Sequence, residues 1–110
     1  VKGYHGVTLA SASLSGIPTM HQHFDLPMSD VLRTLCPHPY QFAKDGESPE
    51  QFATRCAEEL EELILKEGPE TIAGFILEPV SGSSTGASVP PESYLRGVAE
   101  ICKKYEILTI

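Results

Sequence analysis

The chain has 110 residues and a net charge of −7. A stretch of this length forms at most one domain, and 41% hydrophobic with 21% charged residues is typical of a folded protein rather than a disordered one. Its eight Lys and Arg residues are scattered, so neither nucleic acid nor an anionic membrane is an expected partner.

The N-terminal stretch combines an aromatic pair with a helix-forming segment. Gly3 and Gly6 flank Tyr4 and His5, and glycines on both sides let the backbone turn sharply and approach a ligand closely. The two rings would then point outward from a loop. The alternative is that they are turn residues packed against the core. Residues 8–15 are rich in Ala and Ser, which predicts a tightly packed helix.

The next stretch, residues 17–30, contains two prolines and no sustained hydrophobic period, so we expect an irregular surface loop. A metal site in this part of the chain would draw on His21, His23, Cys36 and His38. Their spacing matches neither the helical HxxxH pair nor the paired CxxC of structural zinc sites. We therefore predict polar loop residues and no metal.

A short strand is predicted from Val31 to Cys36, where apolar and polar residues alternate. Pro37 and Pro39 end it, because proline cannot donate a hydrogen bond to a neighbouring strand. Residues 37–47 are then expected to form a loop.

The clearest predicted element is a helix that begins after Ser48. Ser48 and Gln51 form a capping box with Pro49 at the first helical position, and Gly68 followed by Pro69 ends the helix. One face is apolar at helical spacing, with Phe52, Cys56, Leu60, Leu63 and Ile64. We interpret the acidic opposite face as solvated rather than as a binding patch. It carries Glu58, Glu59, Glu61 and Glu62.

An apolar run from Ile72 to Leu77 ends at Glu78, the first charge after it. A short apolar run bounded by breakers predicts a strand that is buried on both faces. Ligands of parallel sheets bind at the carboxyl ends of the strands, because the loops open into a crevice there. Glu78 is therefore a candidate site residue. Alternatively, it caps a loop or pairs with an arginine.

The C-terminal part predicts a loop, a helix and a strand. Residues 80–89 are rich in Gly and Ser but lack the glycine patterns of nucleotide phosphate loops. A helix begins at residues 90–92, and residues 107–110 resume a strand. This βαβ unit has parallel strands, and a second such unit precedes it from residue 31, so the predicted fold class is α/β. The buried stripe of the helix is Tyr94, Leu95, Val98, Ile101, Cys102 and Tyr105.

The sequence also predicts the cellular location of the protein and the redox state of its cysteines. No apolar segment approaches the about 20 residues of a membrane span, and VKGYHG at the N-terminus is no signal peptide, so we predict a cytoplasmic protein. Cys36, Cys56 and Cys102 are odd in number and widely spaced, which favours buried free thiols over disulfides.

Four motifs follow one another along the chain: YHGVT at residues 4–8, AGFILEPVSG at 73–82, VPPESYL at 89–95 and ICKKYEIL at 101–108. In this order they resemble the class III, pyridoxal phosphate (PLP)-dependent aminotransferases of fold type I. The resemblance covers all 110 residues. It implies the parallel βαβ units of the large domain of such a transferase, with PLP as the cofactor. Residues 1–110 would be part of this PLP-binding domain, which is incomplete at both ends.

The resemblance also implies roles for individual residues. Tyr4 would stack its ring on one face of the cofactor's pyridine, an arrangement that holds a flat π system without using its polar edge. His5 would lie near the cofactor or the substrate. Glu78 would orient groups around the cofactor at the floor of the site rather than transfer protons. Gly82 would let the following loop pass close by.

Two departures from the family pattern bear on chemistry. Ser83 stands where members that use glutamate carry an acidic residue, which favours an amine or ω-amino acid donor with pyruvate or a similar small keto acid as acceptor. The family's aspartate to the pyridine nitrogen, its cofactor-binding lysine and its phosphate-binding stretch have no counterpart here. We therefore assign no catalytic residue to this chain and expect it to be inactive alone. None of the lysines of the chain lies in the motif that carries the family's cofactor-binding lysine. They are Lys2, Lys44, Lys66, Lys103 and Lys104.

The leading hypothesis is thus an internal fragment of an aminotransferase that is active as a complete homodimer. One alternative is a small α/β binding module without chemistry. Another is a different class III activity, such as a racemase, mutase or decarboxylase, because fold alone does not determine function.

Overall fold

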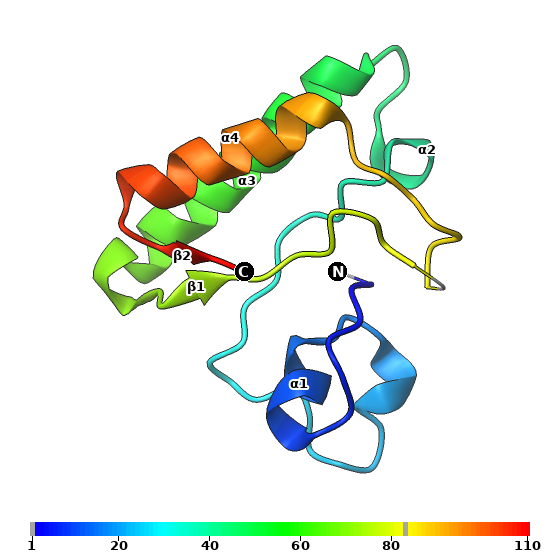
Figure 1. Ribbon diagram of the computed structural model, residues 1–110, viewed down its shortest axis with the longest axis vertical. Helices are drawn as coiled ribbons and strands as arrows, with labels where there is room; N and C mark the ends of the chain where they lie inside the picture. The colour runs from blue at the N-terminus through cyan, green and yellow to red at the C-terminus, as the bar shows by residue number, and fades with distance from the viewer. Residues whose placement is uncertain (1, 83) are drawn as a thin grey trace.

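The computed structural model describes residues 2–82 and 84–110. Two long helices, α3 (Pro49–Glu67) and α4 (Glu92–Lys104), run side by side in the same direction (Figure 1). Next to them lies a small sheet of two strands, β1 (Gly74–Phe75) and β2 (Leu108–Thr109). Within the described part of the chain, no helix is both long and apolar enough to cross a bilayer.

The predicted C-terminal βαβ unit is present. β1 and β2 are parallel, with Gly74 opposite Leu108 and Phe75 opposite Thr109, and α4 connects them. Hydrogen bonding continues beyond the named strands, since Leu77 N–H donates to the Ile110 carbonyl at 3.1 Å. The carboxyl end of β1, where Glu78 follows, is therefore held in place by β2.

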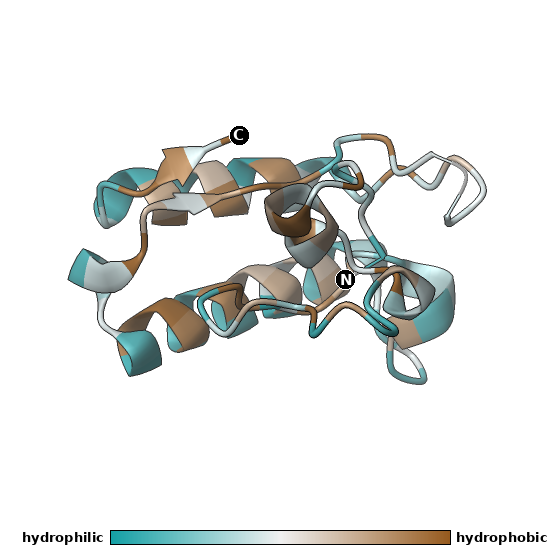
Figure 2. Cartoon of the chain, turned by 90° about the horizontal axis from the view of Figure 1, so that it is seen from below, coloured by the Kyte–Doolittle hydropathy of each residue, from teal (hydrophilic) through white to brown (hydrophobic). Residues whose placement is uncertain are grey.

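The prediction of a strand buried on both faces is wrong for β1. Phe75 and Leu77 pack against the core, whereas Gly74 on the other side of the pleat is exposed. β2 shows the same asymmetry, because Ile107 is 5% exposed and Leu108 is 68% exposed. Successive side chains of a strand point to opposite faces, and the helices cover only one of them (Figure 2).

The predicted strand at Val31 to Cys36 is not formed. The segment is extended, but among the described residues no strand lies beside it at the about 4.8 Å spacing that hydrogen bonding between strands requires. A cavity separates it from β1 instead. The described residues therefore form one βαβ unit rather than two. The loop predicted at 37–47 contains a single helical turn, α2 (Pro39–Phe42).

The first helix, α1 (Leu9–Leu14), lies within the predicted range of 8–15. Thr8 and Ser11 form a capping box at its start, a feature that was not predicted. Residues 17–30 are irregular as predicted, apart from a short 3-10 turn, η1 (Pro18–Met20).

Both ends of α3 follow the prediction. The Ser48 and Gln51 capping box is present, and Gly68 closes the helix with a φ of +95°, a conformation that favours glycine. A second 3-10 turn, η2 (Pro69–Thr71), leads into β1. The core lies between α3, α4 and the strands, and its buried members are Phe52, Ala53, Cys56, Leu60, Ile64, Tyr94, Val98, Cys102 and Ile107.

The three cysteines are free and buried, which confirms that prediction. Removal from water disfavours a thiolate, so burial raises the pKa of the Cys56 thiol to about 12 and also raises the pKa of Cys36. Neither thiol is an activated nucleophile.

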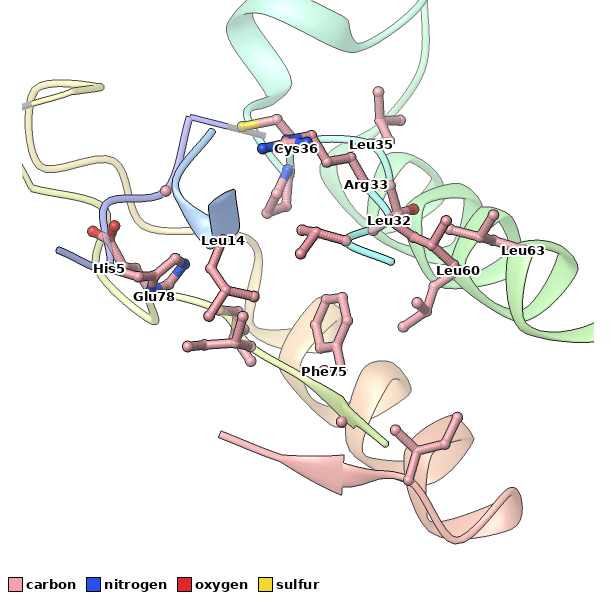
Figure 3. A pocket seen from close by; sticks show the side chains of 18 of the residues that line it. His5, Leu14, Leu32, Arg33, Leu35, Cys36, Leu60, Leu63, Phe75 and Glu78 are labelled. Carbon is pink, nitrogen blue, oxygen red and sulfur yellow. The ribbon is translucent and has the colours of Figure 1, made fainter. Parts of the chain in front are cut away.

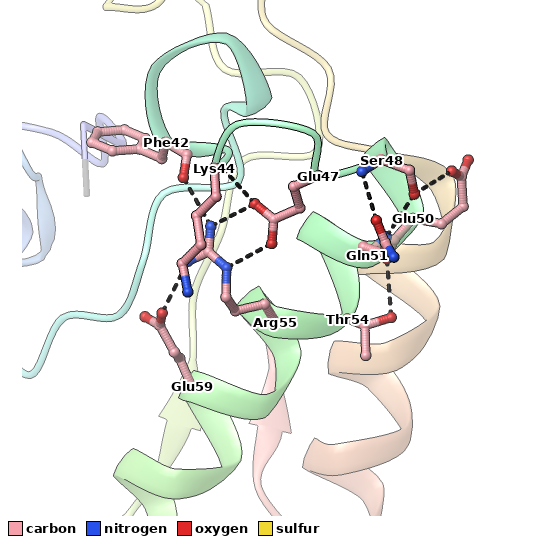
Figure 4. Close-up of polar contacts among 9 residues, drawn as sticks. All are labelled: Phe42, Lys44, Glu47, Ser48, Glu50, Gln51, Thr54, Arg55 and Glu59. Atoms are coloured by element: carbon pink, nitrogen blue, oxygen red, sulfur yellow. Dashed lines mark hydrogen bonds and ion pairs between the residues drawn. The ribbon is translucent and has the colours of Figure 1, made fainter.

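An arginine on α3 fixes the loop that leads into the helix (Figure 4). The guanidinium of Arg55 holds both carboxylate oxygens of Glu47 at 2.8 and 2.9 Å and donates to the Phe42 carbonyl at 2.8 Å. It also reaches Glu59 at 3.2 Å and lies over the Phe52 ring at 5.1 Å. This bidentate ion pair joins residues 42–47 to α3.

We expect the Glu47 to Arg55 pair to make stability pH-dependent. The hydrogen bonds from Arg55 lower the pKa of Glu47 from 4.5 to about 2. A carboxylate whose folded pKa is lowered stabilises the protein above its unfolded pKa, and this contribution is lost as the pH falls toward the folded value. Glu47→Gln should therefore lower the urea midpoint at neutral pH, and the difference from wild type should shrink between pH 4.5 and about 2. Glu62→Gln, at an exposed position on α3, is the control. A difference that grows on acidification would contradict the pairing.

Candidate functional site

The Tyr4 and His5 turn belongs to a loop that is closed at its base. Lys2 N–H donates to the Gly16 carbonyl at 3.2 Å, and Gly16 N–H donates to the Gly3 carbonyl at 2.8 Å. Gly6 has a φ of +115°, and a Cβ at this position would lie 2.8 Å from the Ser11 Oγ. Glycine is therefore strongly favoured at position 6, both for the positive φ and for the close approach to Ser11.

Glu78 joins two loops at the carboxyl end of β1. One carboxylate oxygen accepts a hydrogen bond from Tyr4 N–H, and the other accepts from Gly82 N–H at 3.2 Å. Tyr4 and Gly82 are remote from each other in sequence, so this side chain links two distant parts of the chain. Glu78 therefore caps both loops, and its hydrogen-bond partners are backbone amides rather than an arginine.

His5 and Glu78 line the same cavity, which has a volume of about 400 Å³ (Figure 3). A Cβ on Gly3 would lie 2.9 Å from His5 Nε2 and 3.6 Å from Glu78 Oε1, so both polar groups converge on Gly3. The cavity extends between β1 and the extended segment at 31–38. The ring of Tyr4 does not line it and is 51% exposed, so Tyr4 is not packed against the core.

The loop after β1 also contacts the N-terminal stretch. Ser84 Oγ donates to the Lys2 carbonyl at 2.6 Å, and an isolated bridge between Ser81 and Ser88 closes the loop. Ser83, on which the acceptor argument depends, lies outside the described residues. The contact through Ser84 was not predicted, because a serine in a Gly and Ser-rich loop has no distinguishing sequence signal.

The four metal candidates do not gather. His21 Nε2 lies 2.9 Å from both the Ala12 and the Ser15 carbonyl, so this nitrogen donates to the end of α1. Over residues 2–82 and 84–110, no group of three or more His, Cys, Asp or Glu side chains is placed to hold a metal ion. His38 Nδ1 is buried without a hydrogen-bond partner in this part of the chain.

Comparison with known proteins places the whole chain in one family. The family model described as aminotransferase class-III matches residues 1–110. The chain is 61% identical over 109 residues to a mitochondrial gamma-aminobutyrate transaminase 1 of Oryza sativa subsp. indica, covering 99% of the chain and 21% of that protein. It is 59% identical over 109 residues to a chloroplastic gamma-aminobutyrate transaminase 3 of Solanum lycopersicum, with the same coverage of each.

Solved structures of transaminases also resemble this chain. An omega transaminase from Pseudomonas jessenii in complex with PMP superposes with a TM-score of 0.95 at 54% identity. The match covers 99% of this chain and 24% of that one. The chain thus spans about a fifth of the curated relatives and about a quarter of the structural ones.

The relatives correct the prediction of a cytoplasmic protein. The two plant relatives reported above are named mitochondrial and chloroplastic, which contradicts that location. The inference failed because it used the absence of a signal peptide from a stretch that spans about a fifth of these relatives. The PLP dependence implied by the resemblance is a property of the matched family. A match along its entire length, supported by identities above 50% in sequence and structure, shows that the chain belongs to the class III aminotransferases.

Proposed function

We propose that residues 1–110 are part of the large, fold type I cofactor-binding domain of a PLP-dependent aminotransferase. The complete protein moves an amino group from an ω-amino acid or amine to a small keto acid. Gamma-aminobutyrate, the ω-amino acid in the names of the plant relatives, is the proposed donor. Pyruvate is the proposed acceptor, on the ground that Ser83 replaces the acidic residue of members that use glutamate.

The observation that carries the proposal is the double hydrogen bond of Glu78. It brings the Tyr4 turn to the carboxyl end of β1, which is where ligands of parallel sheets bind. Tyr4 is 51% exposed, so its aromatic side chain is accessible to a ligand at this junction. These residues fit a flat ring system, because the exposed Tyr4 side chain can cover one of its faces while Glu78 holds the two neighbouring loops in place.

Bound PLP supplies an electron sink, which allows the amino group to leave one substrate and join another. The residues of this chain bind and orient. Tyr4 would cover a face of the cofactor, while Glu78 holds the surrounding loops and His5 lines the adjoining cavity. None of the lysines in the chain lies in the motif that would bind the cofactor covalently, so the 110 residues alone are expected to be inactive.

We further propose that the complete enzyme is a homodimer. The segment of residues 2–30 exposes three large apolar side chains, namely Val7, Leu9 and Phe24 at 74%, 66% and 64% exposure. Large apolar side chains favour burial against another surface, and in the proposed dimer that surface belongs to the partner subunit. Light scattering of the complete protein measures its mass, and a monomer would contradict the proposal.

Replacing the ring of Tyr4 tests the cofactor site. Tyr4→Ala in the complete protein should raise the dissociation constant of PLP about tenfold, because stacking and burial of an aromatic ring contribute of order 1 kcal/mol or more. Tyr4→Phe keeps the ring face and should bind like wild type. Absorbance titration of the apoprotein with PLP measures both. Unchanged affinity in Tyr4→Ala would remove Tyr4 from the site, and absence of PLP binding by wild type would overturn the proposed function.

A further inference from the structure

A fully buried serine lies at the end of α1, directly behind the Tyr4 and His5 turn. Ser15 has 0% exposure. Its Oγ accepts a hydrogen bond from His5 N–H at 2.8 Å and lies 2.9 Å from the Ser11 carbonyl, to which it donates. The Gly6 carbonyl lies 3.3 Å away on the loop side. One hydroxyl therefore links the turn to the helix.

We infer that Ser15 is a positioning residue for the cofactor site, an inference that rests on the proposed function. The amides of Tyr4 and His5 are consecutive in the chain, and they are held from different directions. Glu78 accepts from the first and Ser15 from the second. Two fixed N–H groups leave the backbone at Tyr4 little freedom to rotate, so the position from which its side chain leaves the backbone is set before the cofactor arrives.

Ser15 is itself anchored through its backbone carbonyl by two side chains. Its carbonyl accepts from the Arg33 guanidinium at 3.0 Å and from His21 Nε2 at 2.9 Å. Arg33 also holds the Ser13 carbonyl at 2.7 Å. The last carbonyls of a helix have no partner within the helix, and here charged and ring donors satisfy them. The loop at 17–33 thereby supports the turn that carries Tyr4.

Removing the Ser15 hydroxyl should loosen the turn without removing any atom from the site. His5 N–H would lose its acceptor in a partly buried place, which is costly for a backbone donor. The turn would then sample other orientations of Tyr4. Because the cofactor binds only the fraction with the correct orientation, its apparent affinity falls with that fraction.

Ser13 provides a matched control on the same helix. It is also 0% exposed, and Ser13→Ala removes the same hydroxyl. Its Oγ, however, donates to the Leu9 carbonyl at 2.8 Å and accepts from Met28 N–H at 3.1 Å, so it makes no hydrogen bond to the Tyr4 and His5 turn. A purely structural loss should therefore be similar in Ser13→Ala and Ser15→Ala.

The experiment uses the complete protein in its apo form and measures thermal midpoint, PLP dissociation constant and the induced circular dichroism of bound PLP. We expect both variants to lose thermal stability, but only Ser15→Ala to bind PLP about tenfold more weakly and with altered dichroism. Equal affinity and equal dichroism in the two variants would overturn the inference while leaving the proposed function intact. Failure of wild type to bind PLP would instead reject the proposed function.

Discussion

Glu78→Gln in the complete enzyme should raise the dissociation constant of PLP about a hundredfold, the largest effect expected of any single change in the site. The carboxylate accepts from Tyr4 N–H with one oxygen and from Gly82 N–H with the other. An amide of the same shape has only one oxygen and turns an N–H group toward the second donor. Two charge-assisted hydrogen bonds are thus replaced by one neutral bond and one repulsive contact.

The same titration of apoprotein with PLP measures this change, with Glu58→Gln as the matched control. Glu58 lies exposed on α3, so the identical substitution there removes a charge without touching either loop. Equal affinities of the two variants would mean that the junction made by Glu78 does not support the cofactor site.

Phe52→Ala should destabilise the complete protein by about 3–5 kcal/mol. Phe52 is 0% exposed and belongs to the cluster between α3, α4 and the strands. Truncation removes its burial and leaves a cavity that neighbouring helices cannot close without moving. It also removes the face over which the Arg55 guanidinium lies. Urea unfolding at fixed protein concentration measures the loss.

Tyr40→Ala is the control for Phe52→Ala, because it also removes an aromatic ring but at an exposed position. Tyr40 is 94% exposed, so removing its ring should change the free energy of unfolding by less than about 0.5 kcal/mol. A comparable loss in both variants would show that the unfolding transition does not report on the core between α3 and α4.

The helices were predictable because their signals are local. Ser48, Pro49 and Gln51 lie within one turn and specify the start of α3 without reference to the rest of the chain. Gly68 specifies its end in the same way. Strands differ, since they depend on a neighbour. The segment at 31–36 has the alternation of a strand, but the described residues provide no partner, and β1 has helices on one face only.

The site could be predicted only in part, for the same reason. Tyr4 and Glu78 stand out as an aromatic between glycines and an acid after an apolar run, and the structure brings the Tyr4 backbone to the Glu78 carboxylate. Ser15 does not stand out. It is one of several serines in a segment rich in Ala and Ser, and its partner His5 is ten residues away. Such a contact depends on how the loop closes, which no local pattern encodes.

The buried thiols have a consequence for oxidative stress. Cys56 and Cys102 lie fully enclosed in the core between α3 and α4, and the thiol of Cys56 stays protonated at physiological pH. Peroxide and alkylating agents attack thiolates that they can reach. Damage at these sulfurs must therefore wait until the two helices separate, so the rate of modification records how often this region opens.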